Sequence, residues 1–198
     1  SNDQIEVSPF VYRGLENILD GEYESALSDF DKSLELDGED VMVLAYKARL
    51  LNKMDRDSEA LDVWERVLGL QPKWEYAQLN KASSLVNMGK NEQALLAYML
   101  IAGDDPFGPF AELSIMNQAF VYYNLGKYKK AIEHWKKGVV FAEVNKELSG
   151  SLKKEILRDL IYGYAEVKDL PDAIDFYKKH GDRSDLAKMI FFLGQTFY

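Results

Sequence analysis

The chain has 198 residues, 47% of them hydrophobic, which is enough to form the core of one or two globular domains. Its net charge of −9 argues against nucleic acid or an anionic membrane surface as the main partner, because both bind through a basic footprint. The sequence contains no cysteine, which excludes disulfides and thiol chemistry.

A ten-residue pattern occurs five times along the chain. It consists of a turn residue, an Ala followed by Leu or Ile, and an aromatic residue four positions after the Ala. The copies are Gly21…Ala26…Phe30, Asp55…Ala60…Trp64, Gly89…Ala94…Tyr98, Gly126…Ala131…Trp135 and Lys168…Ala173…Tyr177. Successive alanines lie 34, 34, 37 and 42 residues apart. A period of this length indicates a solenoid, in which each unit buries its apolar face against its neighbours.

Each copy of the pattern predicts a turn followed by a helix. The first residue of the pattern suits a helix end, where a left-handed residue closes the last turn. The segment before each turn also has helical periodicity, as shown by Ala82, Leu85 and Met88 before the third turn. Each unit is therefore expected to be an antiparallel helix pair, with helix A before the turn and helix B after it.

These residues resemble the tetratricopeptide repeats, a family whose unit of about 34 residues has a small residue in helix A and an Ala early in helix B. The resemblance implies an all-α fold: a right-handed α-α superhelical solenoid of about five helix-turn-helix repeats plus a C-terminal helix, in one domain spanning 1–198. The expected repeats are 7–40, 41–74, 75–108, 112–145 and 154–181, and the expected C-terminal helix is 183–198.

Small residues are expected where the two helices of a repeat meet. In the first four repeats the helix A residues are Gly14, Ala48, Ala82 and Ala119, which face Ala26, Ala60, Ala94 and Ala131. Without large side chains the backbones can approach to the lower end of the usual range, about 8–10 Å. The fifth repeat has Ile161 instead, so its helix pair is expected to pack more loosely or at another angle. The repeated aromatic residues Trp64 and Trp135 are expected in the core.

The resemblance also implies a concave groove lined by the A helices. Its candidate peptide-binding residues are Tyr46, Arg49, Lys53, Tyr76, Asn80, Ser83, Asn87, Asn117, Phe120 and Asn124. A primary amide both donates and accepts hydrogen bonds, so the asparagines can hold a peptide backbone whatever its side chains. The aromatic residues can supply broad apolar contacts. We therefore expect a scaffold that binds an extended segment of another protein.

The C-terminal segment predicts one more helix, capped by Asp182 or Ser184. Five apolar residues run together from Met189 to Leu193, whereas a terminal solenoid helix should have a polar outer face. Two interpretations remain open: the natural chain continues past Tyr198, through truncation of this sequence or a following unit, or the helix mediates self-association through Phe191, Phe192 and Phe197.

Nothing in the sequence predicts catalysis. Glycine-rich phosphate-binding motifs do not occur, and the two histidines, His134 and His180, are isolated, so no zinc site, other metal site or cofactor is expected. No apolar run approaches the roughly 20 residues that cross a bilayer. The start shows no signal peptide, so we expect a cytoplasmic protein unless a targeting segment has been removed.

Two alternatives to the peptide-binding scaffold follow from the same residues. In the first alternative, the chain is an assembly subunit or oligomerising adaptor that uses its convex face or its C-terminal helix. In the second, it is the regulatory portion of a larger multidomain protein.

Overall fold

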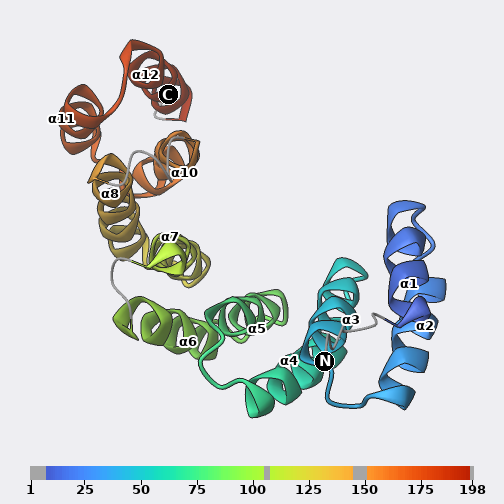
Figure 1. Cartoon of the computed structure of the whole chain (residues 1–198). Helices are drawn as coiled ribbons and strands as arrows, with labels where there is room; N and C mark the ends of the chain where they lie inside the picture. The colour runs from blue at the N-terminus through green and yellow to red at the C-terminus, as the bar shows by residue number, and fades with distance from the viewer. Residues whose placement is uncertain (1–7, 105–107, 145–150, 197–198) are drawn as a thin grey trace. The chain divides into compact units, whose positions relative to one another are not determined.

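A computed structural model describes residues 8–104, 108–144 and 151–196, and within these ranges the chain forms eleven α-helices and no strand (Figure 1). The all-α fold class predicted from the sequence is confirmed. The chain divides into two compact units, residues 1–90 and 91–198.

The first unit contains five helices. They are α1 (Pro9–Leu19), α2 (Tyr23–Leu36), α3 (Val41–Lys53), α4 (Asp57–Leu70) and α5 (Glu75–Asn87). Helices α1 and α2 pack as one antiparallel hairpin and α3 and α4 as the next (Figure 1). In addition, α2 packs on α3, α4 packs on α5, and the two A helices α3 and α5 are in contact.

The second unit contains the remaining six helices. They are α6 (Asn91–Asp104), α7 (Pro109–Asn124), α8 (Tyr128–Val144), α10 (Leu152–Val167), α11 (Leu170–His180) and α12 (Arg183–Thr196). Helix α7 packs between α6 and α8, α8 packs on α10, and α12 packs on both α10 and α11.

The turn at the start of each pattern has the predicted left-handed residue. The backbone φ angle is +80° at Gly21, +72° at Gly89 and +69° at Gly126, and it is +58° at Asp55 and +56° at Lys168. In the first four turns the following amide donates to a carbonyl five residues earlier, at 2.8–2.9 Å, which closes the end of helix A. Asp55 therefore adopts the conformation that glycine has in the first, third and fourth repeats, and its departure from the pattern leaves the turn unchanged.

The residues shared by the repeats form the interior, as predicted. The small residues of helix A and helix B are all buried, and so is every aromatic residue of the pattern: Phe30, Trp64, Tyr98, Trp135 and Tyr177. A Cβ atom built on Gly14 would lie 2.7 Å from Cε1 of Phe30, so the first repeat has no room for a side chain at this position.

The fifth helix pair differs from the others in its packing. Helix α10 makes far fewer contacts with α11 than with α8 or α12, which confirms the looser pairing expected from Ile161. The close approach in this region occurs instead between α10 and α8, at Gly163. A Cβ on Gly163 would lie 2.8 Å from Cγ1 of Ile132 and 3.0 Å from Cζ3 of Trp135.

The repeat boundaries differ slightly from those expected. Helix α7 begins at Pro109 and α10 at Leu152, each a little before the expected start of its repeat at 112 or 154. Proline at the first position of a helix is favourable because its fixed φ angle suits a helix and its missing N–H would have no partner there. The division between the two units falls at the turn of the third expected repeat, after Lys90. A single domain over 1–198 stays a prediction.

A buried carboxylate joins the two helices of the first repeat. Asp29 on α2 has only 3% of its surface exposed. Its carboxylate accepts hydrogen bonds from Nε of Arg13 at 2.7 Å, from Nη2 of Arg13, and from Nδ2 of Asn17 at 3.0 Å. These bonds from Arg13 hold the pKa of the Asp29 carboxyl below its ordinary value of 3.8.

Because of Asp29, the free energy of unfolding of the first unit should depend on pH. Because its pKa is lower in the folded state, its contribution is complete above the ordinary carboxyl pKa and is lost as the pH falls through the lowered value. We expect Asp29→Asn to reduce stability at neutral pH and to lose less stability on acidification than the wild type. Urea denaturation followed by circular dichroism at about pH 7 and about pH 3 measures both effects.

The matched control is Asp31→Asn, because the Asp31 side chain is 51% exposed and pairs with Lys47 on the surface. This variant removes a carboxylate from the surface and should lose less stability at neutral pH than Asp29→Asn. If the wild type and Asp29→Asn lost the same stability on acidification, Asp29 would not be a source of the pH dependence.

Candidate functional site

Seven of the ten predicted groove residues lie on the two contacting A helices of the first unit, α3 and α5. Tyr46, Arg49 and Lys53 lie on α3, and Tyr76, Asn80, Ser83 and Asn87 lie on α5; all seven are at least partly exposed. The guanidinium carbon of Arg49 is 6.0 Å from the centre of the Tyr76 ring, a distance typical of a cation–π contact. The structure therefore brings predicted residues of both helices together at this point.

Two polar residues of α5 bond to their own helix. Nδ2 of Asn80 donates to the carbonyl of Tyr76 at 2.7 Å, and Oγ of Ser83 donates to the carbonyl of Leu79 at 3.1 Å. Each bond fixes the rotamer of its side chain. An amide has two N–H donors and an acceptor oxygen, so the bond to Tyr76 uses only part of the capacity of Asn80.

Asn87 belongs to a polar cluster that joins helices of neighbouring repeats. Its Nδ2 donates to Oδ1 of Asp57 at 3.0 Å. Asn52 donates to the same oxygen at 2.6 Å and to Oγ of Ser84 at 2.8 Å, and its own Oδ1 accepts from Nε1 of Trp64 at 2.9 Å. Asn52 could not be identified from the sequence, because only the folded chain shows that its amide meets three partners.

The other three predicted residues lie on α7 in the second unit. Asn117 is partly exposed and Asn124 is exposed. Phe120 has 37% of its surface exposed and meets the ring of Trp135 edge-on, with ring centres 5.6 Å apart. This helix thus presents an aromatic ring between two amides.

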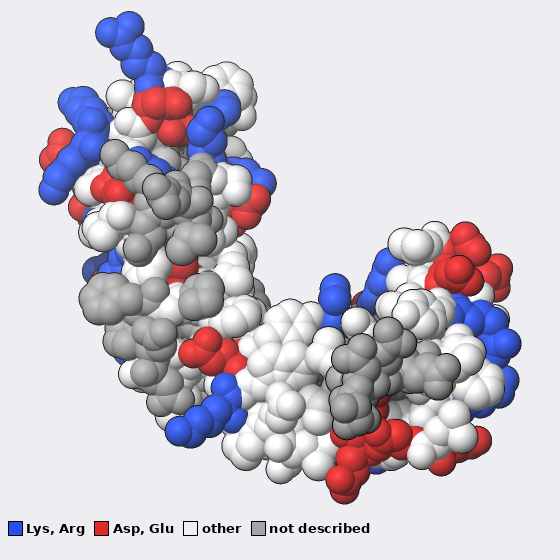
Figure 2. Space-filling model, in the orientation of Figure 1, with Lys and Arg blue, Asp and Glu red and all other residues white. Residues whose placement is uncertain are grey.

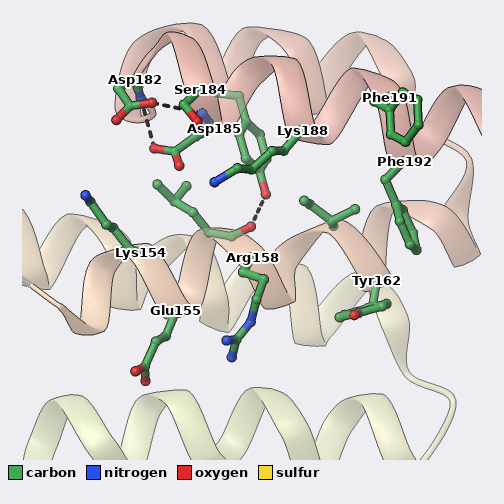
Figure 3. Close-up of a pocket in the computed structure, with 13 residues that line it drawn as sticks. Lys154, Glu155, Arg158, Tyr162, Asp182, Ser184, Asp185, Lys188, Phe191 and Phe192 are labelled. Atoms are coloured by element: carbon green, nitrogen blue, oxygen red, sulfur yellow. Dashed lines mark hydrogen bonds between the residues drawn. The ribbon is translucent and has the colours of Figure 1, made fainter.

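The second unit also has an open cavity of about 490 Å³ between α10 and α12, which was not predicted (Figure 3). Its apolar lining includes Leu157, Ile161 and Tyr177, with Tyr162 and Phe192 at one end. The rings of Tyr162 and Phe192 meet edge-to-face with centres 5.4 Å apart. A volume of this size is typical of pockets for small ligands or anchoring side chains.

The charged residues of this cavity come from both helices. Figure 3 shows Lys154 on α10 and Lys188 on α12 directed into the space between the helices. Asp182 and Asp185 accept hydrogen bonds from each other's backbone amides, at 2.9 and 3.1 Å, so Asp182 caps α12, one of the two alternatives predicted. The amide of Asp185 and, to a smaller extent, the two lysines lower the pKa of Asp182.

The residues predicted for self-association occupy different environments on α12. Met189 and Leu193 are fully buried, whereas Ile190 is 48% and Phe191 is 68% exposed. Phe192 is partly buried against Tyr162. Phe197 lies outside the described residues. The apolar run therefore divides into a buried side that packs on α10 and α11 and an exposed side centred on Phe191.

Charge is distributed unevenly between the two units. Residues 1–90 contain 18 acidic and 10 basic residues, a net charge of −8, whereas residues 91–198 contain 15 and 14, a net charge of −1. Side chains of both signs are visible on the surface of each unit (Figure 2). The acidity noted in the sequence is thus almost entirely a property of the first unit.

Both histidines have partners inside the protein. Nδ1 of His134 lies 2.9 Å from the carbonyl of Lys130, and burial lowers the pKa of this histidine. Nδ1 of His180 lies 3.0 Å from Oε2 of Glu143. Among the described residues, no three His, Asp or Glu side chains are grouped closely enough to hold a metal ion. The helices in these ranges include none with the length and apolarity needed to span a bilayer.

Comparisons with known proteins show the fold. No protein-family model matches the chain. The apo form of RapI has a TM-score of 0.78 at 21% identity and covers 96% of this chain and 58% of its own. MamA 41-end from Desulfovibrio magneticus RS-1 has a TM-score of 0.72 at 17% identity and covers 90% of this chain and 93% of its own.

One curated protein is similar in sequence. Protein STIP1 homolog from Dictyostelium discoideum is 27% identical over 73 residues, which is 37% of this chain and 13% of that protein. The matched stretch is therefore a small part of this relative. Together, the solved structures and this relative place the chain among helical solenoids of stacked hairpins.

Proposed function

We propose that this solenoid of helix pairs, which resembles the tetratricopeptide repeats, is a protein-interaction scaffold that binds an extended peptide segment along its A helices. The observation that carries the proposal is the contact between α3 and α5, which places Arg49 over Tyr76 beside Asn80. A cation, an aromatic ring and an amide next to one another suit both the side chains and the backbone of a peptide.

The residues on α7 support the same function in the second unit. Asn117, Phe120 and Asn124 repeat the combination of amides and an exposed ring. The α10–α12 cavity offers a further place for an apolar side chain. No described residue group suggests a catalytic centre, and we propose that the chain acts by binding rather than by catalysis.

Removing two amides tests this proposal. A random peptide library displayed on phage would be selected against the intact chain, and the affinity of the enriched peptide measured by fluorescence polarisation. We expect the double variant Asn80→Ala, Asn117→Ala to weaken binding at least about ten-fold, roughly 1.4 kcal/mol, because the backbone of the peptide loses its amide partners.

The matched control is Gln93→Ala, which removes an exposed amide from α6, outside the predicted groove. It should leave the affinity unchanged. An enriched peptide that binds the double variant as tightly as the wild type would rule out binding through these amides.

Self-association through α12 is a second candidate, favoured by the exposure of Ile190 and Phe191. Because Phe192 packs on Tyr162, a charge at Phe192 would disturb the fold itself, and Phe191 is the better position for a test. If α12 joins two chains, Phe191→Glu should abolish concentration-dependent dimers in sedimentation experiments. Dimers that persist in this variant would argue against α12.

A regulatory role within a larger protein is a third candidate. The only observation that favours it is that the chain matches part of two longer proteins, 58% of RapI and 13% of the STIP1 homolog. The length of the complete gene product tests it directly.

A further inference from the structure

The outer face of α6 carries an apolar stripe of three residues that are at least half exposed. Leu96 is 64%, Met99 is 50% and Leu100 is 68% exposed. The three residues follow the i, i+3, i+4 spacing that places side chains on one face of a helix. The opposite face of α6 packs through Ala94, Tyr98 and Ile101, which are buried.

The other four B helices have polar residues at the same positions. Counted from the shared Ala of the repeat, these positions are two, five and six residues later. They hold Ser28, Asp31 and Lys32 on α2, Asp62, Glu65 and Arg66 on α4, Glu133, Lys136 and Lys137 on α8, and Asp175, Lys178 and Lys179 on α11. The repeat therefore does not require apolar residues at these positions. The stripe on α6 departs from the polar residues that the other four B helices have there.

We propose that the outer face of α6 is a self-association surface, on which α6 of a second copy of this chain packs antiparallel about a twofold axis. Three features of the chain favour a second copy as the occupant. They are the order of side-chain sizes along the stripe, the absence of charge within it, and the charge of the unit that carries it.

The order of sizes makes the stripe complementary to itself. One turn beyond Leu100 on the same face is Gly103, where an added Cβ would meet no atom of the described residues within 4 Å. In an antiparallel pair centred between Met99 and Leu100, Leu96 of each copy lies opposite Gly103 of the other, and Met99 lies opposite Leu100. A large side chain then faces an open position and the two central residues face each other, as a twofold interface requires.

Charge favours contact through the second unit. The segment from Leu96 to Gly103 contains no Asp, Glu, Lys, Arg or His. Residues 91–198 have a net charge of only −1, whereas two copies meeting through residues 1–90 would each bring a charge of −8. Like charges repel, so a second copy approaches the nearly neutral unit more readily. A single helical stripe is smaller than the roughly 800 Å² per partner of stable complexes, so the dimer should be weak and reversible.

Replacing the stripe with the residues of another repeat tests the proposal. The variant Leu96→Asp, Met99→Glu, Leu100→Arg transfers the side chains that α4 has at the same positions, so its fold should be unchanged, as circular dichroism can verify. In sedimentation equilibrium at rising concentration, the mass of the wild type should increase from 22.7 kDa towards twice that value. The variant should remain monomeric, with association weakened at least about ten-fold.

The absence of cysteine permits a second, independent test. A single cysteine introduced by Met99→Cys lies next to the proposed axis and should form a disulfide between two copies under mild oxidation. The matched control is Glu65→Cys, which places a cysteine at the equivalent position of α4 and should not crosslink at the same rate.

Two results would overturn the proposal: a wild type that stays monomeric at all concentrations, or association that is unchanged in the triple variant. Loss of association in Phe191→Glu but not in the triple variant would also overturn it and assign the contact to α12. Peptide binding through Asn80 and Asn117 uses other residues, so either proposal can fail without the other.

Discussion

Replacing Trp64 with alanine is expected to destabilise the first unit by about 3–5 kcal/mol, the range for removing a large buried aromatic side chain. The indole has no exposed surface and meets the ring of Tyr76 edge-on at 6.1 Å. Its Nε1 donates to Asn52, which in turn bonds to Asp57 and Ser84. The variant therefore loses both a core side chain and a partner of the polar cluster. Urea denaturation followed by circular dichroism measures the change in the free energy of unfolding.

Trp135 provides the matched comparison, because it occupies the same repeat position but its buried Nε1 has no hydrogen-bond partner among the described residues. Both Trp64→Phe and Trp135→Phe remove part of an indole ring. Only Trp64→Phe also leaves Oδ1 of Asn52 without its donor, which should cost roughly 1–3 kcal/mol more. Equal losses in the two variants would show that the bond to Asn52 contributes nothing.

Replacing Gly163 with leucine should destabilise the second unit by about 3 kcal/mol, the upper end of the usual range for overpacking. Even a Cβ at this position would lie within 3.0 Å of both Ile132 and Trp135. These residues are themselves buried in the core of the unit, so they cannot move aside without disturbing their neighbours. A fall in the denaturation midpoint of the second unit measures the effect.

Gly194 is the control for Gly163, because it also lies within a helix, but an added Cβ there would meet no atom of the described part of the chain within 4 Å. Gly194→Ala should therefore stabilise α12 by about 0.5–1 kcal/mol through the higher helix propensity of alanine. Opposite signs are expected for Gly163→Ala and Gly194→Ala. Stabilisation by both would contradict the close approach of α10 and α8.

The repeat pattern was sufficient to predict the fold class because each of its residues has a local reason for its position. The small residues permit close backbones, the left-handed residues close the A helices, and the aromatic residues fill the core between them. These requirements act over about 34 residues, so they are visible in the sequence without knowledge of the folded chain. The same reasoning located the side chains on α3 and α5 that lie beside one another.

Contacts that depend on the packing of distant residues were not visible in this way. The sequence indicated Ile161 as a misfit in the fifth repeat, but not that Gly163 provides the close approach to α8. Asn87 was interpreted as a groove residue, and the structure shows that it also bonds to Asp57 of the preceding repeat. Its role in peptide binding stays a prediction.

The α10–α12 cavity could not be predicted, because five of its thirteen lining residues lie on a helix outside the repeat pattern. Lys188 and Phe192 on α12 have no equivalents in the other repeats, so no alignment of the repeats could place them opposite Tyr162. The stripe on α6 could have been found from the sequence, by comparing the outer positions of all five B helices. Its significance depends on exposure, which only the structure supplies.

The distribution of the tryptophans gives each compact unit its own fluorescent reporter. Trp64 and Trp74 belong to the first unit, and Trp135 is the single tryptophan of the second. An indole shifts its emission to longer wavelength when it leaves a buried apolar site for water. A variant that retains only Trp135 would therefore report the unfolding of residues 91–198 by its tryptophan fluorescence. A variant that lacks only Trp135 would report the unfolding of residues 1–90. Coincident or separate transitions of the two would reveal whether the repeats unfold as one cooperative body.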